Sequence, residues 1–272
     1  MKQFLKIILV SFLILVGNSC TKKLDIKIDS QADRVVVEGL ITNEVTPFVV
    51  KLSKTLALQD SNQYPKINNA FVTVADDAGH LDTLLFIADG VYRTNGPRQG
   101  VVGRTYFLTV IANGQTYTAQ DKLFSVSPID SVYSKYQTAG SGLGIREDGY
   151  YVYFNSTDPP NEKNYYYYEV YRNDSSVLKS NQIGVYDDRF LAPVIIGSRL
   201  PGKYKLGDKM NFNLYSLSEA GYKYYNGIQL QLQNDGGFFS TPPANAPNNL
   251  SNGALGFFRA SSVSRDSLII TQ

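Results

Sequence analysis

Residues 104–119 read RTYFLTVIANGQTYTA, and this stretch decides the class of fold. From Arg104 to Ala112, residues that favour strands alternate between two faces, and the pattern resumes from Gln115 to Ala119 after the Asn113-Gly114 pair. Asn-Gly between two alternating runs is the strongest short-range signal of a β-hairpin. We therefore predict two antiparallel strands here, in a protein that is mainly β.

The sequence before this hairpin has the same character. Turn residues at Asp76-Asp77-Ala78-Gly79 and at Asp89-Gly90 separate short apolar runs. Strands are expected at 34–42, 48–53, 70–75, 81–87 and 91–94. Many short strands at close spacing are typical of a sandwich or barrel. Residues 34–122 are therefore predicted to form a β-sandwich domain. It resembles transthyretin-like and immunoglobulin-like domains, through the segments 69–74, 89–92 and 103–110.

The remaining residues, 123–272, are predicted to form a second β-rich domain with one α-helix. Tyrosine-rich runs favour strands at 150–154 and 165–171. Further short strands are expected at 183–186, 209–215, 254–262 and 268–271. A helix is predicted near 217–234, because apolar residues recur there at helical spacing. Ser216 and Glu219 have the spacing of a capping box, so Ser216 is the expected N-cap.

Composition limits the classes of function. The chain has 26 Lys and Arg against 24 Asp and Glu, and residues 1–19 contain Lys2 and Lys6 but no acid. Without those residues the chain is formally neutral, and it has no dense basic run, so nucleic acid is not an expected partner. The single cysteine leaves no disulfide. The 20 Tyr and 14 Phe suit half-buried strands, and only one His is present.

The N-terminus is predicted to export and anchor the protein. A short basic segment precedes an apolar run from Ile7 to Val16, which is the layout of a secretory signal and is too short to span a bilayer. The sole cysteine, Cys20, follows. This segment resembles the lipobox of bacterial lipoproteins, which implies a signal peptide at 1–19, acyl chains on Cys20 and a lipidated tether at 20–33. The alternative is an ordinary cleaved signal with an incidental cysteine.

The whole chain after the signal resembles a family of Bacteroidota lipoproteins known only as domain of unknown function 4249. The resemblance is carried by residues 35–39 (VVVEG), 90–94 (GVYRT), 100–106 (GVVGRTY), 128–133 (PIDSVY), 241–245 (TPPAN) and 252–258 (NGALGFF). It implies an outer-membrane lipoprotein, commonly encoded beside TonB-dependent receptors, on either the periplasmic or the cell-surface face. It implies no catalytic residues.

Few residues are suited to catalysis or to metal binding. Nucleophile systems of the Ser-His-Asp or Cys-His type need a histidine base, and the one histidine, His80, lies in a predicted surface turn. Cys20 is assigned to the anchor, so the usual zinc ligands are missing. Calcium needs only oxygen ligands, and the candidates are the acid pairs Asp76 with Asp77, Glu147 with Asp148, and Asp187 with Asp188. These pairs are more simply solvated turn residues, so we predict no enzyme activity, no cofactor and no metal.

The tyrosines of 150–153 and 165–171 allow two interpretations. Packing between neighbouring strands accounts for them without a ligand, and this interpretation is favoured. Alternatively, one face of these strands presents a flat aromatic surface to sugars or proteins. The loop at 241–252 is similarly either a contact loop or a conformational cap.

Three functions remain open. The favoured one is a non-enzymatic accessory or binding module, anchored in the outer membrane through Cys20 and working with a TonB-dependent transport receptor. The second is a surface lipoprotein that captures glycans or peptides through its tyrosines. The third is a hydrolase that uses carboxylates alone, which requires two carboxyl groups about 5 to 10 Å apart.

Overall fold

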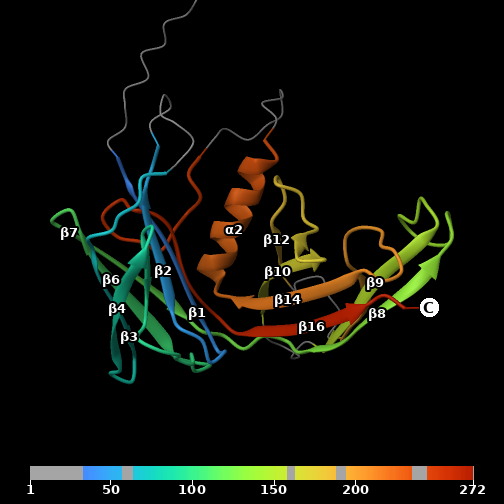
Figure 1. The fold of residues 1–272 in the computed structure, drawn as a ribbon, viewed down its shortest axis with the longest axis horizontal. Coiled ribbons are helices and arrows are strands. Elements are labelled where there is room, and N and C mark those ends of the chain that lie inside the picture. Colours follow the sequence, from blue (N-terminus) through green and yellow to red (C-terminus); the bar gives the residue numbers. More distant parts are fainter. Residues whose placement is uncertain (1–32, 57–63, 158–162, 188–193, 235–243, 272) are drawn as a thin grey trace, which may run out of the picture. The chain divides into compact units, whose positions relative to one another are not determined.

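The computed structural model describes residues 33–56, 64–157, 163–187, 194–234 and 244–271. Cys20, the signal peptide predicted at 1–19 and all but the last residue of the tether lie outside these ranges, as do residues 241–243 of the Pro/Asn loop. The described part is mainly β, with one helix, so the predicted fold class is confirmed (Figure 1). Within these ranges no helix has the length and apolar character needed to span a bilayer.

Eight strands form the first sheet. They are β1 (Val35–Thr42), β2 (Val49–Lys54), β3 (Phe71–Asp76), β4 (Leu81–Ala88), β5 (Val91–Arg93), β6 (Thr105–Ala112), β7 (Gln115–Lys122) and β15 (Leu255–Ser261). Their order is β15-β1-β2-β5-β4-β3-β6-β7. The predicted hairpin at 104–119 is confirmed, because β6 and β7 pair antiparallel from Thr105–Lys122 to Ala112–Gln115. Asn113 and Gly114 join them with φ angles of 52° and 74°, as a tight hairpin turn requires.

The first sheet encloses one apolar core. Alternate residues of its strands point inward, and Val37, Val72 and Val110 are completely buried in a single cluster. Burying one such side chain contributes roughly 1.5–3 kcal/mol. The two edge strands, β7 and β15, approach each other, since the backbone N–H of Ala260 donates to Asp121 Oδ2 at 2.9 Å. The sheet therefore folds over on itself, as a sandwich does.

The other strands build two smaller sheets around a second core. They are β8 (Ile129–Gln137), β9 (Gly149–Thr157), β10 (Tyr165–Arg172), β11 (Ser175–Ser176), β12 (Gly184–Asp187), β13 (Val194–Arg199), β14 (Lys209–Leu217) and β16 (Val263–Ile269). One sheet has the order β13-β9-β8, and the other has the order β11-β10-β14-β16 with β12 also paired to β10. Phe154, Tyr166 and Phe212 lie in their shared core.

The predicted helix is present as α2 (Glu219–Leu232), but its predicted cap is wrong. The N-cap is Ser218, whose hydroxyl accepts a hydrogen bond from the Gly221 N–H at 3.0 Å. Ser216 instead belongs to β14, where its hydroxyl donates to the Phe124 carbonyl at 2.7 Å and accepts from the Ser262 N–H at 2.9 Å. The strand includes Ser216 and ends at Leu217, where the sequence predicts the first helical residue, so the second serine provides the cap.

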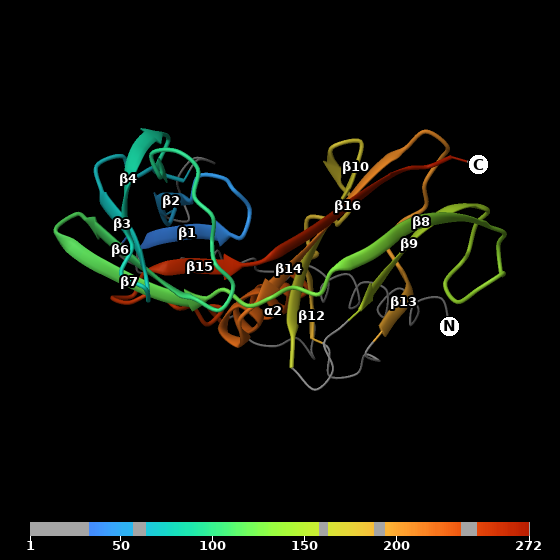
Figure 2. The ribbon, with the colours of Figure 1, turned by 90° about the horizontal axis from the view of Figure 1, so that it is seen from below.

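Two consecutive strands near the C-terminus belong to different sheets. β15 pairs parallel with β1, from Val36–Leu255 to Thr42–Ser261. After Ser262 the chain continues as β16, which pairs antiparallel with β14. Figure 2 shows β15 beside β1, and β16 continuing from it into the sheet that contains β14. The sequence places every residue after 122 in the second domain, yet this strand forms the edge of the first sheet.

A buried tyrosine offers a test of the first core. Tyr92 is 1% exposed, and its hydroxyl donates to the Ile67 carbonyl at 3.0 Å and accepts from the Ala70 N–H at 2.9 Å. Tyr92→Phe leaves both backbone groups without this partner, and we expect the free energy of unfolding in urea to fall by about 1–3 kcal/mol. Tyr117→Phe removes a hydroxyl whose one partner among the described residues is the Gln115 side chain, and we expect a smaller loss. Equal losses would contradict a special role for Tyr92.

Candidate functional site

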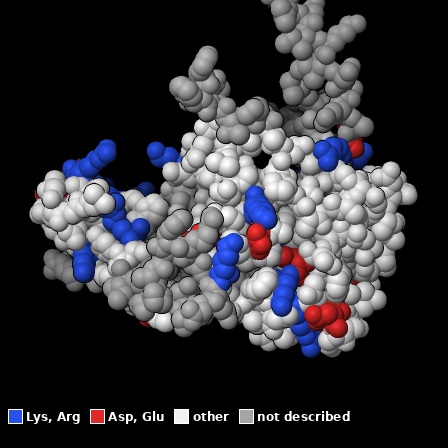
Figure 3. Space-filling view, turned by 180° about the vertical axis from the view of Figure 1, so that it is seen from behind, with Lys and Arg blue, Asp and Glu red and all other residues white. Residues whose placement is uncertain are grey.

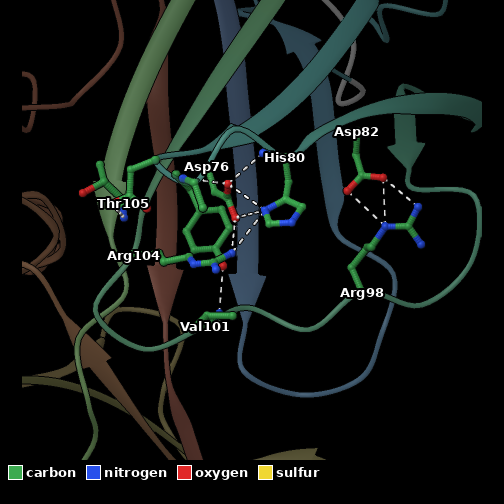
Figure 4. Close-up of polar contacts among 10 residues, drawn as sticks. Asp76, His80, Asp82, Arg98, Val101, Arg104 and Thr105 are labelled. Carbon is green, nitrogen blue, oxygen red and sulfur yellow. Dashed lines mark hydrogen bonds and ion pairs between the residues drawn. The ribbon is translucent and has the colours of Figure 1, made fainter.

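The predicted turn around His80 is a compact hydrogen-bonded structure at the end of β3 (Figure 4). The Asp76 carboxylate is buried and accepts bonds from the N–H groups of Ala78 and His80, each at 3.0 Å, and from Arg104 Nη1 at 2.6 Å. The His80 side chain is 70% exposed, with Nδ1 3.0 Å from Asp76 Oδ2. Burial raises the pKa of Asp76, but the bonds from His80 and Arg104 outweigh it and hold this pKa below its usual range.

These contacts favour a structural role for the turn. A cleft of about 370 Å³ opens beside it, and its charged lining groups bond one another. Within this lining, Arg98 Nε lies 2.8 and 3.0 Å from the two carboxylate oxygens of Asp82. Asp77 accepts a bond from the Thr105 N–H at 2.9 Å and so ties the turn to β6. The charges of this cleft are satisfied without a ligand.

The other acid pairs do not converge on a metal site. Glu147 forms an ion pair with Lys203, and Asp148 accepts a bond from the Ala139 N–H at 2.7 Å. Asp187 ends β12, and Asp188 lies outside the described residues. Across the described ranges, no group of three or more His, Cys, Asp and Glu side chains is placed to hold a metal ion.

The tyrosines of the predicted strand 165–171 pack against neighbouring aromatic rings. Tyr166 stacks on Tyr186 with ring centroids 5.1 Å apart, and Tyr165 packs on Tyr222 of α2 at 4.9 Å. Tyr167 packs instead on Tyr225 of α2, at 5.0 Å. The packing interpretation therefore accounts for these residues, and it also brings several rings together beside α2.

A second cleft, which we call the Arg259 cleft, lies between the first sheet and α2. It has a volume of about 350 Å³ and is lined by Glu38, Gly39, Leu40, Val49, Lys51, Tyr224, Tyr225, Ile228, Phe257 and Arg259. The strand register explains this lining. Phe257, Glu38 and Lys51 are direct cross-strand neighbours, and Arg259, Leu40 and Val49 form the next row. Since β15 buries Phe258 and Ala260 in the first core, the alternate residues of the strand face the cleft.

Arg259 is the exceptional residue of this cleft. Only 6% of it is exposed, and its Cζ lies 4.7 Å, 4.8 Å and 5.4 Å from the ring centroids of Tyr167, Tyr215 and Tyr225. It makes no hydrogen bond or ion pair with any residue in the described ranges, and its Nη1 is completely buried without a partner. Attraction to the rings is worth about 0.5–2 kcal/mol per contact, but it does not replace acceptors for the N–H groups.

Two acids close to Arg259, Glu169 and Asp121, are engaged elsewhere. The Glu169 carboxylate accepts bonds from Asn213 Nδ2 and from the Tyr215 hydroxyl, both at 3.1 Å. The Asp121 carboxylate accepts the bond from the Ala260 N–H. Burial raises the pKa of Tyr215 and of Tyr224 to about 12, so both hydroxyls stay protonated at neutral pH. None of these groups supplies an acceptor to the guanidinium.

Two other arginines of the described residues have acidic partners. Arg265 pairs with both oxygens of Glu44, at 2.8 and 2.9 Å, and Arg98 pairs with Asp82. On the face in Figure 3, Lys and Arg side chains are scattered among uncharged residues, and several lie beside Asp or Glu. The buried and unpaired Arg259 contrasts with this arrangement.

The sequence does not predict this cleft, because Arg259 appears there only as one residue of the predicted strand 254–262. An arginine inside an otherwise apolar run, ALGFFRA at 254–260, is the signal that could have marked it. The lining comes from β1, β2, α2 and β15, which lie far apart along the chain. These residues therefore come together as a site only in the folded protein.

Comparison with known proteins gives a family but no activity. No curated protein sequence matches the chain. Among solved structures, it is similar to a two fibronectin type III domain segment from chicken tenascin, at 12% identity and a TM-score of 0.22, over 68% of this chain and 91% of that one. The family described as "Domain of unknown function (DUF4249)" matches residues 21–267. Since that match covers nearly all of the sequence, the chain belongs to the DUF4249 family.

Proposed function

We propose that this protein is a non-enzymatic binding module of the bacterial outer membrane, anchored by lipid on Cys20, and that its ligand binds in the Arg259 cleft. The observation that carries this proposal is a buried guanidinium without a hydrogen-bond acceptor among the described residues, at the wall of a cleft of about 350 Å³. Ligand sites are typically concave and largely apolar, with a few convergent polar groups. The cleft has these properties.

The aromatic lining supports binding rather than simple packing. Tyr224 stacks on Phe257 with ring centroids 5.0 Å apart and an interplanar angle of 25°. Tyr225 contacts both of these rings and also Tyr167. Rings fixed by one another offer a rigid surface, so little conformational entropy is lost when a ligand binds.

The anchor and the transport partner form the second part of the proposal. They are supported by the signal-like N-terminus and by the lipoprotein resemblance described above. Mass spectrometry of the native protein should find Cys20 at the N-terminus with acyl chains. Purification from detergent-solubilised membranes should recover a TonB-dependent receptor with it. An unmodified thiol would contradict the anchor, and repeated recovery of the protein alone would contradict the partnership.

The binding role is tested by blocking the cleft. Ile228 lines the cleft from α2, whereas Leu230 is exposed two residues further along and is not part of the lining. We expect Ile228→Arg to weaken binding of any cleft ligand at least tenfold, because it places a long charged side chain in the cleft. Leu230→Arg adds the same charge to the same helix and should leave binding unchanged.

The measurement is calorimetry with the full chain, using a panel of dipeptides, oligosaccharides and small organic acids and amides. At least one class should bind the wild-type protein and the Leu230→Arg variant but not the Ile228→Arg variant. If every ligand binds all three proteins equally, or none binds at all, the cleft is not a ligand site.

A further inference from the structure

The hydrogen-bonding capacity of Arg259 is unused within the described structure. A guanidinium carries five N–H donors and stays charged at any ordinary pH. Burying such a group without acceptors is costly, and structures normally pair it with an anion. The rings of Tyr167, Tyr215 and Tyr225 surround its carbon, but their hydroxyls and faces do not provide a full set of acceptors. An acceptor that carries negative charge would satisfy these donors.

The surrounding charges favour a monoanion over a phosphate. Among the described residues of the cleft lining, Lys51 is the only other cation, and Glu38 stands directly opposite it on β1. Two further acids lie nearby: Glu169 accepts the bond from the Tyr215 hydroxyl, whose ring contacts Arg259, and Arg259 lowers the pKa of Asp121 against the burial that raises it. A phosphate monoester carries a charge of about −1.5 to −2 and would be repelled by these three acids. A carboxylate carries one charge, and its two oxygens match the planar guanidinium fork.

The rest of the lining selects the body of the ligand. Leu40, Val49 and Ile228 are aliphatic, and Tyr224 and Phe257 are aromatic. A volume of about 350 Å³ is at the small end of the range for ligand sites. This space suits one ring or one branched chain next to the charged group.

We infer that the Arg259 cleft binds a carboxylate attached to a small apolar or aromatic body, with Arg259 as the carboxylate-binding residue. The inference rests on the proposed function, and it adds the chemical class of the ligand. Two sources share this chemistry, a free aryl- or alkyl-carboxylic acid and the C-terminal residue of a peptide. The apolar body occupies the space between α2 and the strands β1 and β2.

Matched acids and amides test the inference on the wild-type full chain. The probes are 3-phenylpropanoate with 3-phenylpropanamide, and N-acetyl-Ala-Phe with its C-terminal amide. Calorimetry should show that at least one acid binds ten times or more tightly than its amide. Preference for the free acid or for the peptide acid identifies the source. Equal affinities of acid and amide in both pairs would overturn the inference.

Variants then test the role of Arg259. Arg259→Met removes the charge and keeps the length, and it should weaken binding of the acid at least tenfold without lowering the melting temperature. Arg259→Lys retains the charge without the planar fork and should give an affinity between those of the wild type and Arg259→Met. This variant still tests the inference if Arg259→Met does not fold. Arg265→Met is the control, because Arg265 lies 5.6 Å from the Tyr215 ring but pairs with Glu44 outside the cleft. It should bind the acid like the wild type.

The two levels of the proposal fail differently. In one outcome, Ile228→Arg abolishes binding, but acid and amide bind equally well and Arg259→Met has no effect. This outcome overturns the carboxylate inference and leaves the proposed binding module intact. Binding that Ile228→Arg does not change overturns both.

Discussion

Replacing Gly256 with alanine is expected to lower the free energy of unfolding by roughly 3–5 kcal/mol. Gly256 lies in β15 with a φ of +98°, a conformation that residues with a side chain rarely adopt. A Cβ at this position would lie 2.0 Å from the Val37 carbonyl oxygen and 2.9 Å from its carbon. Both are backbone atoms of β1, the parallel partner of β15. They cannot move aside without breaking the pairing between the two strands.

A neighbouring glycine provides the control. Gly253 also has a positive φ, +71°, but the nearest atom to an added Cβ is Arg34 Nη2 at 3.9 Å. Gly253→Ala therefore carries only the backbone penalty, about 1 kcal/mol. Urea unfolding of both variants measures the difference. Equal losses would show that β15 does not approach β1 as closely as the structure indicates.

Asp121 should make the stability of the protein fall between about pH 4 and pH 7. The residue is 5% exposed on β7, and burial raises its pKa to about 6, although hydrogen bonds from Ser218 and Ala260 act in the opposite direction. Because the folded pKa lies above the unfolded value, the folded state holds the proton more tightly. The stabilisation is therefore complete below pH 4 and is lost as the pH rises through 6. A shift of about two pH units corresponds to a change on the order of 3 kcal/mol.

Asp121→Asn should remove this part of the pH dependence. The amide oxygen can still accept the bond from the Ala260 N–H, but the side chain no longer ionises. The measurement is the free energy of unfolding in urea at pH 4.5, 5.5, 6.5 and 7.5 for variant and wild type. Asp208→Asn is the control. Hydrogen bonds from Lys205 and Asn173 outweigh burial and lower the pKa of Asp208, so Asp208 changes the stability only below the pH range of this measurement. A wild-type slope that persists in Asp121→Asn would contradict the assignment.

The sequence predicted those parts of the fold that depend on neighbouring residues. The hairpin of β6 and β7 follows from alternation around Asn113-Gly114, and α2 follows from helical spacing of apolar residues. Its cap was misplaced because two serines precede it and only tertiary contacts decide between them. The turn at His80 was likewise expected, and its contacts lie mostly within five residues.

Contacts between distant segments could not be predicted in this way. Nothing near Leu255 indicates that the strand will pair with β1 in parallel, because that register depends on the folded first sheet. The Arg259 cleft depends on the same pairing, since Arg259 reaches Leu40 and Val49 only across it. Side-chain periodicity describes one element at a time, and a site built from four elements leaves no local pattern.

The late position of β15 has a consequence for how the protein matures. A ribosome makes β1 first, and it makes the strand that covers the outer edge of β1 about 220 residues later. Until then the edge of β1 remains open, and an open edge is a template for pairing with other chains. The newly made N-terminal half therefore depends on its own tail for protection against aggregation. A product that terminates early, before residue 255, would lack that protection permanently.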